Sequence, residues 1–263
     1  MTVEKLIQEA KSGEIKFVRL QITDINGMLK NVEVPSKMLP QILEKGAMFD
    51  GSSIDGFVRI EESDMYLKPD VNTYATLPWD GNQGKTVRLI CDVFKPDGSP
   101  FEGDPRYVLK KVIERASKLG YEAFAGPEPE FFIIKREKDC VGPNGRFLDM
   151  GSYFDLLPVD GGEEVRKKIV LSLQEMGFEV EAAHHEVAPS QHEIDFRYTD
   201  ILKTADNIQT FKWVVKTISI VNGLHATFMP KPFEGVAGSG MHVHLSLFSK
   251  GRNAFYDPES EHG

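Results

Sequence analysis

The sequence of 263 residues contains only two cysteines, Cys91 and Cys140. So few thiols exclude a disulfide framework and a zinc site built on cysteines, and they favour a reducing, cytoplasmic setting. No apolar run approaches the roughly 20 residues that a membrane-spanning helix needs, and the N-terminus lacks the charged and apolar pattern of a signal peptide. We therefore expect a protein that is neither exported nor embedded in a membrane.

An excess of positive charge is also missing. The chain carries 31 lysines and arginines against 40 aspartates and glutamates, a net charge of −9. This balance argues against a nucleic-acid-binding surface and suits a protein that handles small molecules or cations. Since 41% of the residues are hydrophobic, the chain can bury a real core, as one large domain or as two of ordinary size.

A glycine-rich phosphate loop is absent as well. Gly84-Lys85-Thr86 resembles the end of that motif, but Trp79 stands where its first glycine is required. A strand-like pattern follows these residues, whereas the motif needs a helix there.

Two patterns of apolar residues divide the chain. Residues 14–34 alternate between apolar and polar around an Asn-Gly pair, which is typical of a β-hairpin. In the second half, apolar residues recur at helical spacing in three stretches that intermix with strand-like stretches. The turn-forming residues of 95–100 separate the two halves. We therefore predict an α+β protein with one domain over 13–98 and a second over 105–263.

Two glutamates of the second half stand at the opening of a predicted strand. Glu128 and Glu130 flank Pro129, which pushes the residue before it toward extended geometry, and four large apolar residues follow. Residues i and i+2 share one face of a strand, so both carboxylates point the same way. Taken alone, the pair is equally typical of a solvated strand end, since glutamate is mostly exposed.

Two further polar clusters fall at strand ends. Glu186 and Glu193 flank a Pro-Ser turn, so they can converge where the chain doubles back. His242, His244 and Ser246 alternate along one strand and share a face. A single histidine in a strand is more often structural than a metal ligand, so the argument rests on the clusters together.

Taken together, the four glutamates and the histidines predict a cation site, because like charges held close are costly unless a cation neutralises them. Carboxylates select hard divalent ions such as Mg²⁺ or Mn²⁺, and an imidazole ligand favours the latter. Two such ions side by side can polarise a phosphoryl group and stabilise its entering and leaving oxygens. The residues thus predict a metal-dependent phosphoryl-transfer or hydrolytic enzyme.

Six ordered motifs resemble those of a known family. They are MFDGSSI (Met48–Ile54), FEGDPR (Phe101–Arg106), GPEPEFF (Gly126–Phe132), HHEVAPSQHEIDF (His184–Phe196), HATFMPKP (His225–Pro232) and GSGMHVH (Gly238–His244). Together they resemble bacterial type I glutamine synthetase, and RIEESDMYLKPD (Arg59–Asp70) resembles its Firmicute-like branch. The resemblance implies an N-terminal β-grasp domain, a catalytic domain on a curved and mostly antiparallel sheet, and a dodecamer with each active site shared between neighbouring subunits.

The resemblance also implies ligands for metal ions. Glu130, Glu186 and Glu193 match the ligands of one divalent ion. Glu128 and His242 match those of a second ion, whose remaining ligand lies further along the family's chain.

Substrate positions follow from the same resemblance. Glu181, His244 and Ser246 match positions on the nucleotide, and Gly238 matches part of the glutamate site. Ala237 stands where the family commonly has asparagine. This difference is tolerable if backbone atoms make the contact, and it weakens glutamate binding if the amide makes it.

A polar loop of the first half carries the remaining matches. Asp50 and Ser53 match the loop that reaches into a neighbouring subunit's site, where the aspartate attracts ammonium and helps deprotonate it. Arg59 matches a position near that interface that is linked to feedback inhibition.

The implied reaction uses ATP to phosphorylate the γ-carboxylate of glutamate, after which ammonia displaces phosphate to give glutamine. The implied partners are glutamate, ammonium, ATP as co-substrate, other copies of the chain and a nitrogen-regulatory protein. The chain is shorter than its family, so we expect the later metal-binding glutamate, the arginines on ATP and glutamate, and the flap to lie outside it, leaving these 263 residues inactive alone.

Two alternatives remain open. One is a γ-glutamyl-polyamine or related amine ligase of the same fold, and the other is a non-catalytic regulatory fragment. The intact sequence Asp50-Gly51-Ser52-Ser53 favours ammonia over a larger amine.

Overall fold

The computed structural model of the chain describes residues 1–54, 56–57, 64–80, 84–136 and 146–261. It consists of two compact units, Met1–Lys118 and Leu119–Gly263. None of the helices in these described ranges is long and apolar enough to cross a bilayer.

The first unit is built on a five-stranded sheet in the order β2-β1-β5-β4-β3. Its strands are β1 (Ile15–Thr23), β2 (Leu29–Pro35), β3 (Ala47–Asp50), β4 (Asp64–Thr76) and β5 (Lys85–Phe94). β1 and β5 run parallel at the centre, and the other neighbours pair antiparallel. The predicted hairpin is confirmed as the β1–β2 pair.

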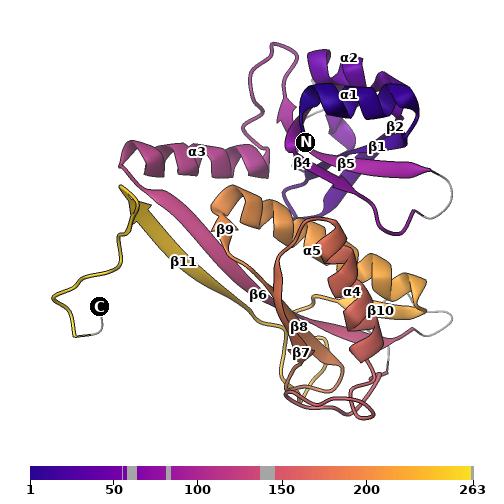
Figure 1. Ribbon diagram of the computed structural model, residues 1–263, viewed down its shortest axis with the longest axis vertical. Coiled ribbons are helices and arrows are strands. Elements are labelled where there is room, and N and C mark those ends of the chain that lie inside the picture. The colour runs from indigo at the N-terminus through magenta and orange to yellow at the C-terminus, as the bar shows by residue number, and fades with distance from the viewer. Residues whose placement is uncertain (55, 58–63, 81–83, 137–145, 262–263) are drawn as a thin grey trace. The chain divides into compact units, whose positions relative to one another are not determined.

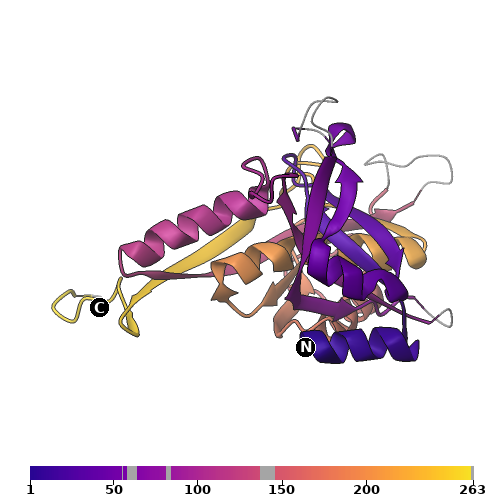
Figure 2. The same cartoon turned by 90° about the horizontal axis from the view of Figure 1, so that it is seen from above.

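Helices cover one face of this sheet. They are α1 (Val3–Ser12), the 3-10 turn η1 (Ser36–Met38) and α2 (Leu39–Lys45). Leu6 of α1 and Leu39 of α2 join Val18, Leu20 and alternate residues of the central strands in one buried core (Figure 1, Figure 2). A short turn, η2 (Gly51–Ser53), follows β3, and helix α3 (Pro105–Lys118) ends the unit. This arrangement confirms the predicted β-grasp domain.

The second unit is built on a seven-stranded sheet around one long strand, β6 (Glu122–Lys135). The order is β12-β11-β6-β8-β7, and β9 and β10 also pair with β6. The other strands are β7 (Val180–His185), β8 (Gln191–Phe196), β9 (Thr199–Asp200), β10 (Leu224–Thr227), β11 (Met241–Ser249) and β12 (Arg252–Asn253). Each of these pairings is antiparallel, as predicted, and Figure 1 shows β6 and β11 running side by side.

Two helices, α4 (Glu163–Glu175) and α5 (Ile201–Val221), lie together against one face of this sheet (Figure 1). Phe131 of β6 points to that face and stacks edge-on against Phe211 of α5, with ring centres 5.8 Å apart. Side chains alternate along a strand, so Glu128 and Glu130 point to the opposite face. An antiparallel sheet can bury one face and leave the other accessible, and the accessible face here carries the carboxylates.

Candidate functional site

A row of polar residues crosses several strands on the accessible face of the second sheet. β6 places Glu130 directly opposite Glu193 of β8, and β7 places His184 opposite Glu193 on the other side. At the other edge of β6, Glu128 lies opposite His242 of β11. Residues directly opposite in antiparallel strands share a face, with Cβ atoms about 4.5–5.5 Å apart. The structure therefore brings the glutamates of separate motifs together.

His184 joins two of the predicted metal ligands. Its Nδ1 lies 3.5 Å from Oε1 of Glu186, and its Nε2 lies 3.6 Å from Oε1 of Glu193. Ligand atoms of His184, Glu193 and Asp195 all lie within 4.8 Å of one another, close enough to share one ion. His184 and Asp195 were not among the ligands predicted from the sequence. Each lies two residues from a predicted glutamate, His184 from Glu186 and Asp195 from Glu193, and side chains two residues apart on a strand share a face.

Two imidazoles of β11 contact Glu128. Nδ1 of His242 lies 3.4 Å from Oε2 of Glu128, and Nε2 of His244 lies 2.8 Å from Oε1. His244, which the family resemblance assigns to the nucleotide, therefore contacts a predicted metal ligand here. Ser246 follows on the same strand and Glu181 lies exposed on β7, and their role toward a nucleotide stays a prediction.

Crowding of the carboxylates affects their protonation. Burial, followed by the charges of Asp195, Glu186, Glu130 and Glu128, raises the pKa of Glu193 to about 8. Its carboxyl group is therefore largely protonated at neutral pH, because its neighbours do not neutralise the charge. A divalent cation would remove this penalty, and the oxygen-rich donor set with one or two imidazoles fits Mg²⁺ or Mn²⁺.

Gln191 connects Glu130 to the loop between β10 and β11. Its Nε2 donates hydrogen bonds to Oε2 of Glu130 (2.6 Å) and to the carbonyl oxygen of Gly238 (2.7 Å). Glycine is required at 238, because a Cβ atom there would overlap the carbonyl oxygen of Pro230. The predicted glutamate-site residues Ala237 and Gly238 thus lie beside a predicted metal ligand.

A buried ion pair holds the turn that carries Glu186. Nε2 of His185 donates to Oδ1 of Asp149 (3.1 Å), and Nδ1 donates to the carbonyl of Glu186 (2.7 Å). Burial lowers the pKa of His185, but these hydrogen bonds outweigh it and raise the pKa. Both ring nitrogens donate, so the imidazole carries a positive charge. Asp149 also accepts the N–H of Ser190 (2.8 Å), which fixes the turn before Gln191.

A second buried pair anchors the strand that carries Glu193. Nη2 of Arg166 donates to Oδ2 of Asp160 (2.7 Å), and Nη1 donates to Nδ1 of His192 (2.9 Å). Burial and then the charge of Arg166 lower the pKa of His192 well below its usual range, so the ring is neutral. Asp149, Asp160 and the two histidines lie close enough to hold a metal ion, but Arg166 and His185 already neutralise the aspartates. This cluster therefore supports the turn and strands that carry Glu128, Glu130, Glu186 and Glu193, the four carboxylates of the accessible face, which we call the carboxylate row.

The predicted ammonium loop lies in the first unit. Asp50 ends β3, and its carboxylate accepts the hydroxyl (2.6 Å) and the backbone N–H (2.8 Å) of Ser52. These two hydrogen bonds lower the pKa of Asp50, so it stays ionised. Ser53 ends η2. The role of this loop in a neighbouring subunit's site stays a prediction, and Arg59 lies outside the described residues.

Comparison with protein families and with related sequences gives matches along almost the whole chain. Residues 14–96 match the family described as "Glutamine synthetase, beta-Grasp domain", and residues 102–263 match "Glutamine synthetase, catalytic domain". Proteins named glutamine synthetase from Thermus thermophilus, Thermotoga maritima and Staphylococcus aureus are 59%, 58% and 56% identical to it. The alignments cover 99%, 100% and 100% of this chain, but only 59%, 60% and 59% of those relatives.

Solved structures with the same fold agree with this assignment. Plasmodium falciparum glutamine synthetase superposes with a TM-score of 0.89 at 26% identity, over 99% of this chain and 56% of that one. A complex of GmaS with ADP gives a TM-score of 0.85 at 31% identity, over 97% of this chain and 58% of that one. From its paired domain matches and its close relatives, the chain belongs to the glutamine synthetase family.

Proposed function

We propose that this chain is part of an enzyme that ligates ammonia to the γ-carboxylate of L-glutamate with ATP, giving glutamine, ADP and phosphate through γ-glutamyl phosphate. The observation that carries the proposal is the carboxylate row, in which Glu130 faces Glu193 and the pKa of Glu193 is raised to about 8. Carboxylates held this close repel each other, and a bound cation would remove that repulsion, so the arrangement is typical of a metal-binding site. The names of the relatives support the reaction.

The metal ligands in this proposal are Glu130, Glu186 and Glu193 for one divalent ion, and Glu128 and His242 for a second. Mg²⁺ or Mn²⁺ bound there would offset negative charge on the phosphates and on the substrate carboxylate. Gln191 and the N–H of Gly240 hold Glu130 by hydrogen bonds to Oε2 (2.6 and 3.1 Å), so that ligand is oriented in advance.

Substrate positions complete the proposal. Glutamate would lie along the loop of Ala237 and Gly238, which Gln191 connects to Glu130. The nucleotide would lie near Glu181, His244 and Ser246, and the ADP complex of the related GmaS supports a nucleotide site on this fold.

The assembly is part of the same proposal. Asp50 and Ser53 would capture ammonium in the site of a neighbouring subunit of a dodecamer, and Arg59 would act in feedback regulation together with a nitrogen-regulatory protein. The proposed domains are residues 13–98 and 105–263, and the proposed location is the cytoplasm, which the scarcity of cysteine favours.

A chimera tests the reaction. Residues 1–263 would be joined to the part of the Thermus thermophilus relative that lies beyond its alignment with this chain, and glutamine formation from glutamate, ammonia and ATP would be measured with Mn²⁺. We expect activity near that of the parent relative. A chimera that folds and binds Mn²⁺ but forms no glutamine contradicts the proposal, and preference for a polyamine over ammonia supports the amine-ligase alternative.

The polypeptide of these 263 residues alone should form no glutamine. Among the described residues, the side chains around Glu130 and Glu193 are carboxylates, imidazoles and the amide of Gln191, whereas the transferred phosphoryl group also needs cationic side chains around it. Glutamine formation by the isolated polypeptide contradicts this expectation.

A further inference from the structure

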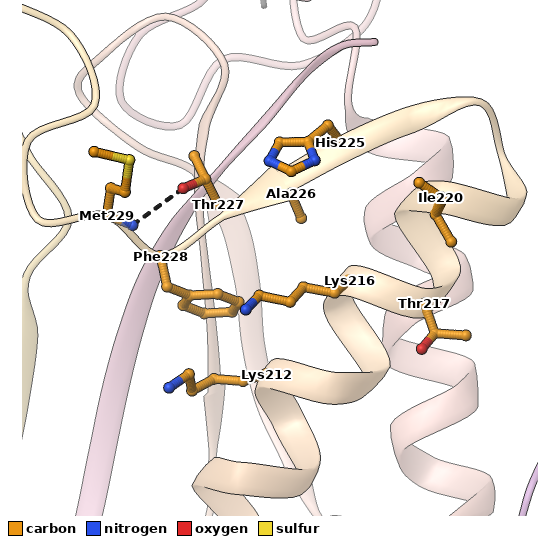
Figure 3. Close-up of a pocket in the computed structure, with 9 residues that line it drawn as sticks. All are labelled: Lys212, Lys216, Thr217, Ile220, His225, Ala226, Thr227, Phe228 and Met229. Atoms are coloured by element: carbon orange, nitrogen blue, oxygen red, sulfur yellow. Dashed lines mark hydrogen bonds between the residues drawn. The ribbon is translucent and has the colours of Figure 1, made fainter. Parts of the chain in front are cut away.

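A hollow of about 570 Å³ opens between the C-terminal half of α5 and strand β10 (Figure 3). Its volume lies in the range of small-molecule sites. None of its lining residues belongs to the carboxylate row. They are Lys212, Lys216, Thr217 and Ile220 from α5, and His225, Ala226, Thr227, Phe228 and Met229 from β10 and the residues after it.

Two lysines one helical turn apart face this hollow. In Figure 3 the side chain of Lys216 extends from α5 toward the ring of Phe228, with Nζ 5.9 Å from the ring centre, and that of Lys212 extends in the same direction below the ring. In the described part of the chain, neither ammonium group lies within 4 Å of a carboxylate. Lys85 and Lys110, by contrast, pair with Glu9 and Asp92. Like charges four residues apart on a helix repel each other, so Lys212 and Lys216 destabilise each other. This pair of positive charges stands out because the chain as a whole has a net charge of −9.

A third nitrogen base, His225, also lines the hollow. The ring of His225 lies on the β10 side of the hollow (Figure 3). Burial, and then the charges of Lys216 and Arg136, lower the pKa of His225, and burial followed by Lys212 lowers that of Lys216. The positive charge of Lys216 is therefore disfavoured in the empty hollow, and an anion bound beside it would stabilise that charge, while the neutral ring of His225 can donate or accept a hydrogen bond.

The rest of the lining is largely apolar. Ile220, Ala226, Phe228 and Met229 supply carbon surface, and the N–H of Met229 donates to Oγ1 of Thr227 (3.2 Å), which fixes the end of β10. An apolar wall with a few charged groups is the usual composition of a small-molecule site. The ammonium group of lysine binds phosphate as a point charge, without the fixed planar geometry that the guanidinium group of arginine imposes.

We propose that this hollow binds a small organic phosphate, with the phosphate group between Lys212 and Lys216 and the organic part against the apolar wall. The proposal does not depend on the ligation of ammonia, since it uses a separate set of side chains.

Calorimetric titration of the 263-residue chain with phenyl phosphate, at low ionic strength and with EDTA to keep the carboxylate row free of metal, tests the proposal. We expect one binding site. The double variant Lys212→Gln/Lys216→Gln should weaken binding by about tenfold or more, because it removes two charge-assisted hydrogen bonds. Lys203→Gln, a matched change on the same helix outside the hollow, should leave the affinity unchanged.

Two comparisons define the ligand class. Inorganic phosphate and benzoate should both bind more weakly than phenyl phosphate, since one lacks the organic part and the other the dianionic group. Phenyl phosphate should also shift the NMR amide signals of residues 212–229, a readout that needs no variant. Absence of binding, or equal affinity of wild type and a folded double variant, overturns the proposal. Inorganic phosphate binding as tightly as phenyl phosphate overturns the organic part of the assignment.

Discussion

Glu130 of β6 and Glu193 of β8 lie directly opposite each other in the antiparallel register. Like charges in this arrangement destabilise a sheet. Burial and the surrounding carboxylates accordingly raise the pKa of Glu193 to about 8. The metal-free protein is therefore less stable than the same sheet with neutral side chains, and that difference favours cation binding.

Replacing Glu130 by glutamine should weaken Mn²⁺ binding by about tenfold or more, because the number of ligand charges sets affinity in such sites. The metal-free melting temperature should stay the same or rise, since repulsion with Glu193 is relieved. Glu122→Gln, on an exposed position of the same strand, should alter neither quantity. Calorimetry and thermal melting measure both effects, and a large loss of metal-free stability would instead give Glu130 a structural role.

The stability of the metal-free chain should fall as pH rises. The folded pKa of Glu193 is about 8 against 4.5 for the free group, so the fold favours the protonated form. Its contribution is complete below about pH 4.5 and is lost as pH approaches about 8, by at most about 5 kcal/mol. Urea unfolding at pH 5.5 and 8.5 measures it.

Two controls isolate that pH effect. Glu193→Gln should flatten the difference between the two pH values, since the titrating group is gone. Saturating Mn²⁺ should also remove it in the wild type. A wild type and a Glu193→Gln variant with identical pH profiles would show that another group is responsible.

Replacing Arg166 by methionine should destabilise the second unit by about 3–5 kcal/mol, because the buried Asp160 keeps the N–H of Gly162 but loses its ion-pair partner. Arg197, whose partner Glu179 is exposed, supplies the matched control. Arg197→Met should not change stability measurably, because exposed ion pairs contribute little. Urea unfolding followed by circular dichroism compares the two, and equal effects would contradict the positioning role of the buried pair.

The 263-residue chain should self-associate through β11. In the described residues, the edge of β11 away from β6 is hydrogen-bonded only near its end, where Leu247 accepts the N–H of Ala254 and Phe248 and Ser249 pair with β12, and Leu245 is 59% exposed. Unpaired edges with apolar side chains promote association. Sedimentation velocity should show oligomers that Leu245→Lys reduces, whereas Val221→Lys at the end of α5 should have little effect. A monomer at all concentrations would be the contrary result.

Local periodicity explains which parts of the site could be predicted. The shared face of Glu128 and Glu130, and that of His242 and His244, follow from the strand period of two, which needs only the nearby backbone. The same period also marks Asp195, two residues after Glu193, once a strand is assigned there.

The buried network could not be predicted in this way. Asp149 meets His185 across 36 positions of sequence, and no periodic pattern joins the two. Helix α1 was likewise missing from the sequence prediction, although Thr2 caps it by accepting the N–H of Lys5 (3.2 Å). Local signals do mark this helix, since Leu6 and Ala10 share its buried face and Gly13 ends it in a left-handed conformation.

His185 and His192 each occupy the space that a side chain would need at a glycine far away in the sequence, Gly151 and Gly162 respectively. A Cβ atom at Gly151 would lie 2.7 Å from Nε2 of His185, and one at Gly162 would overlap Nε2 of His192. Neither glycine can therefore change alone. A chain that diverges from this one can place a larger residue at 151 only together with a smaller one at 185, and the same holds for 162 and 192, so substitutions at these positions should occur as pairs in sequence variation.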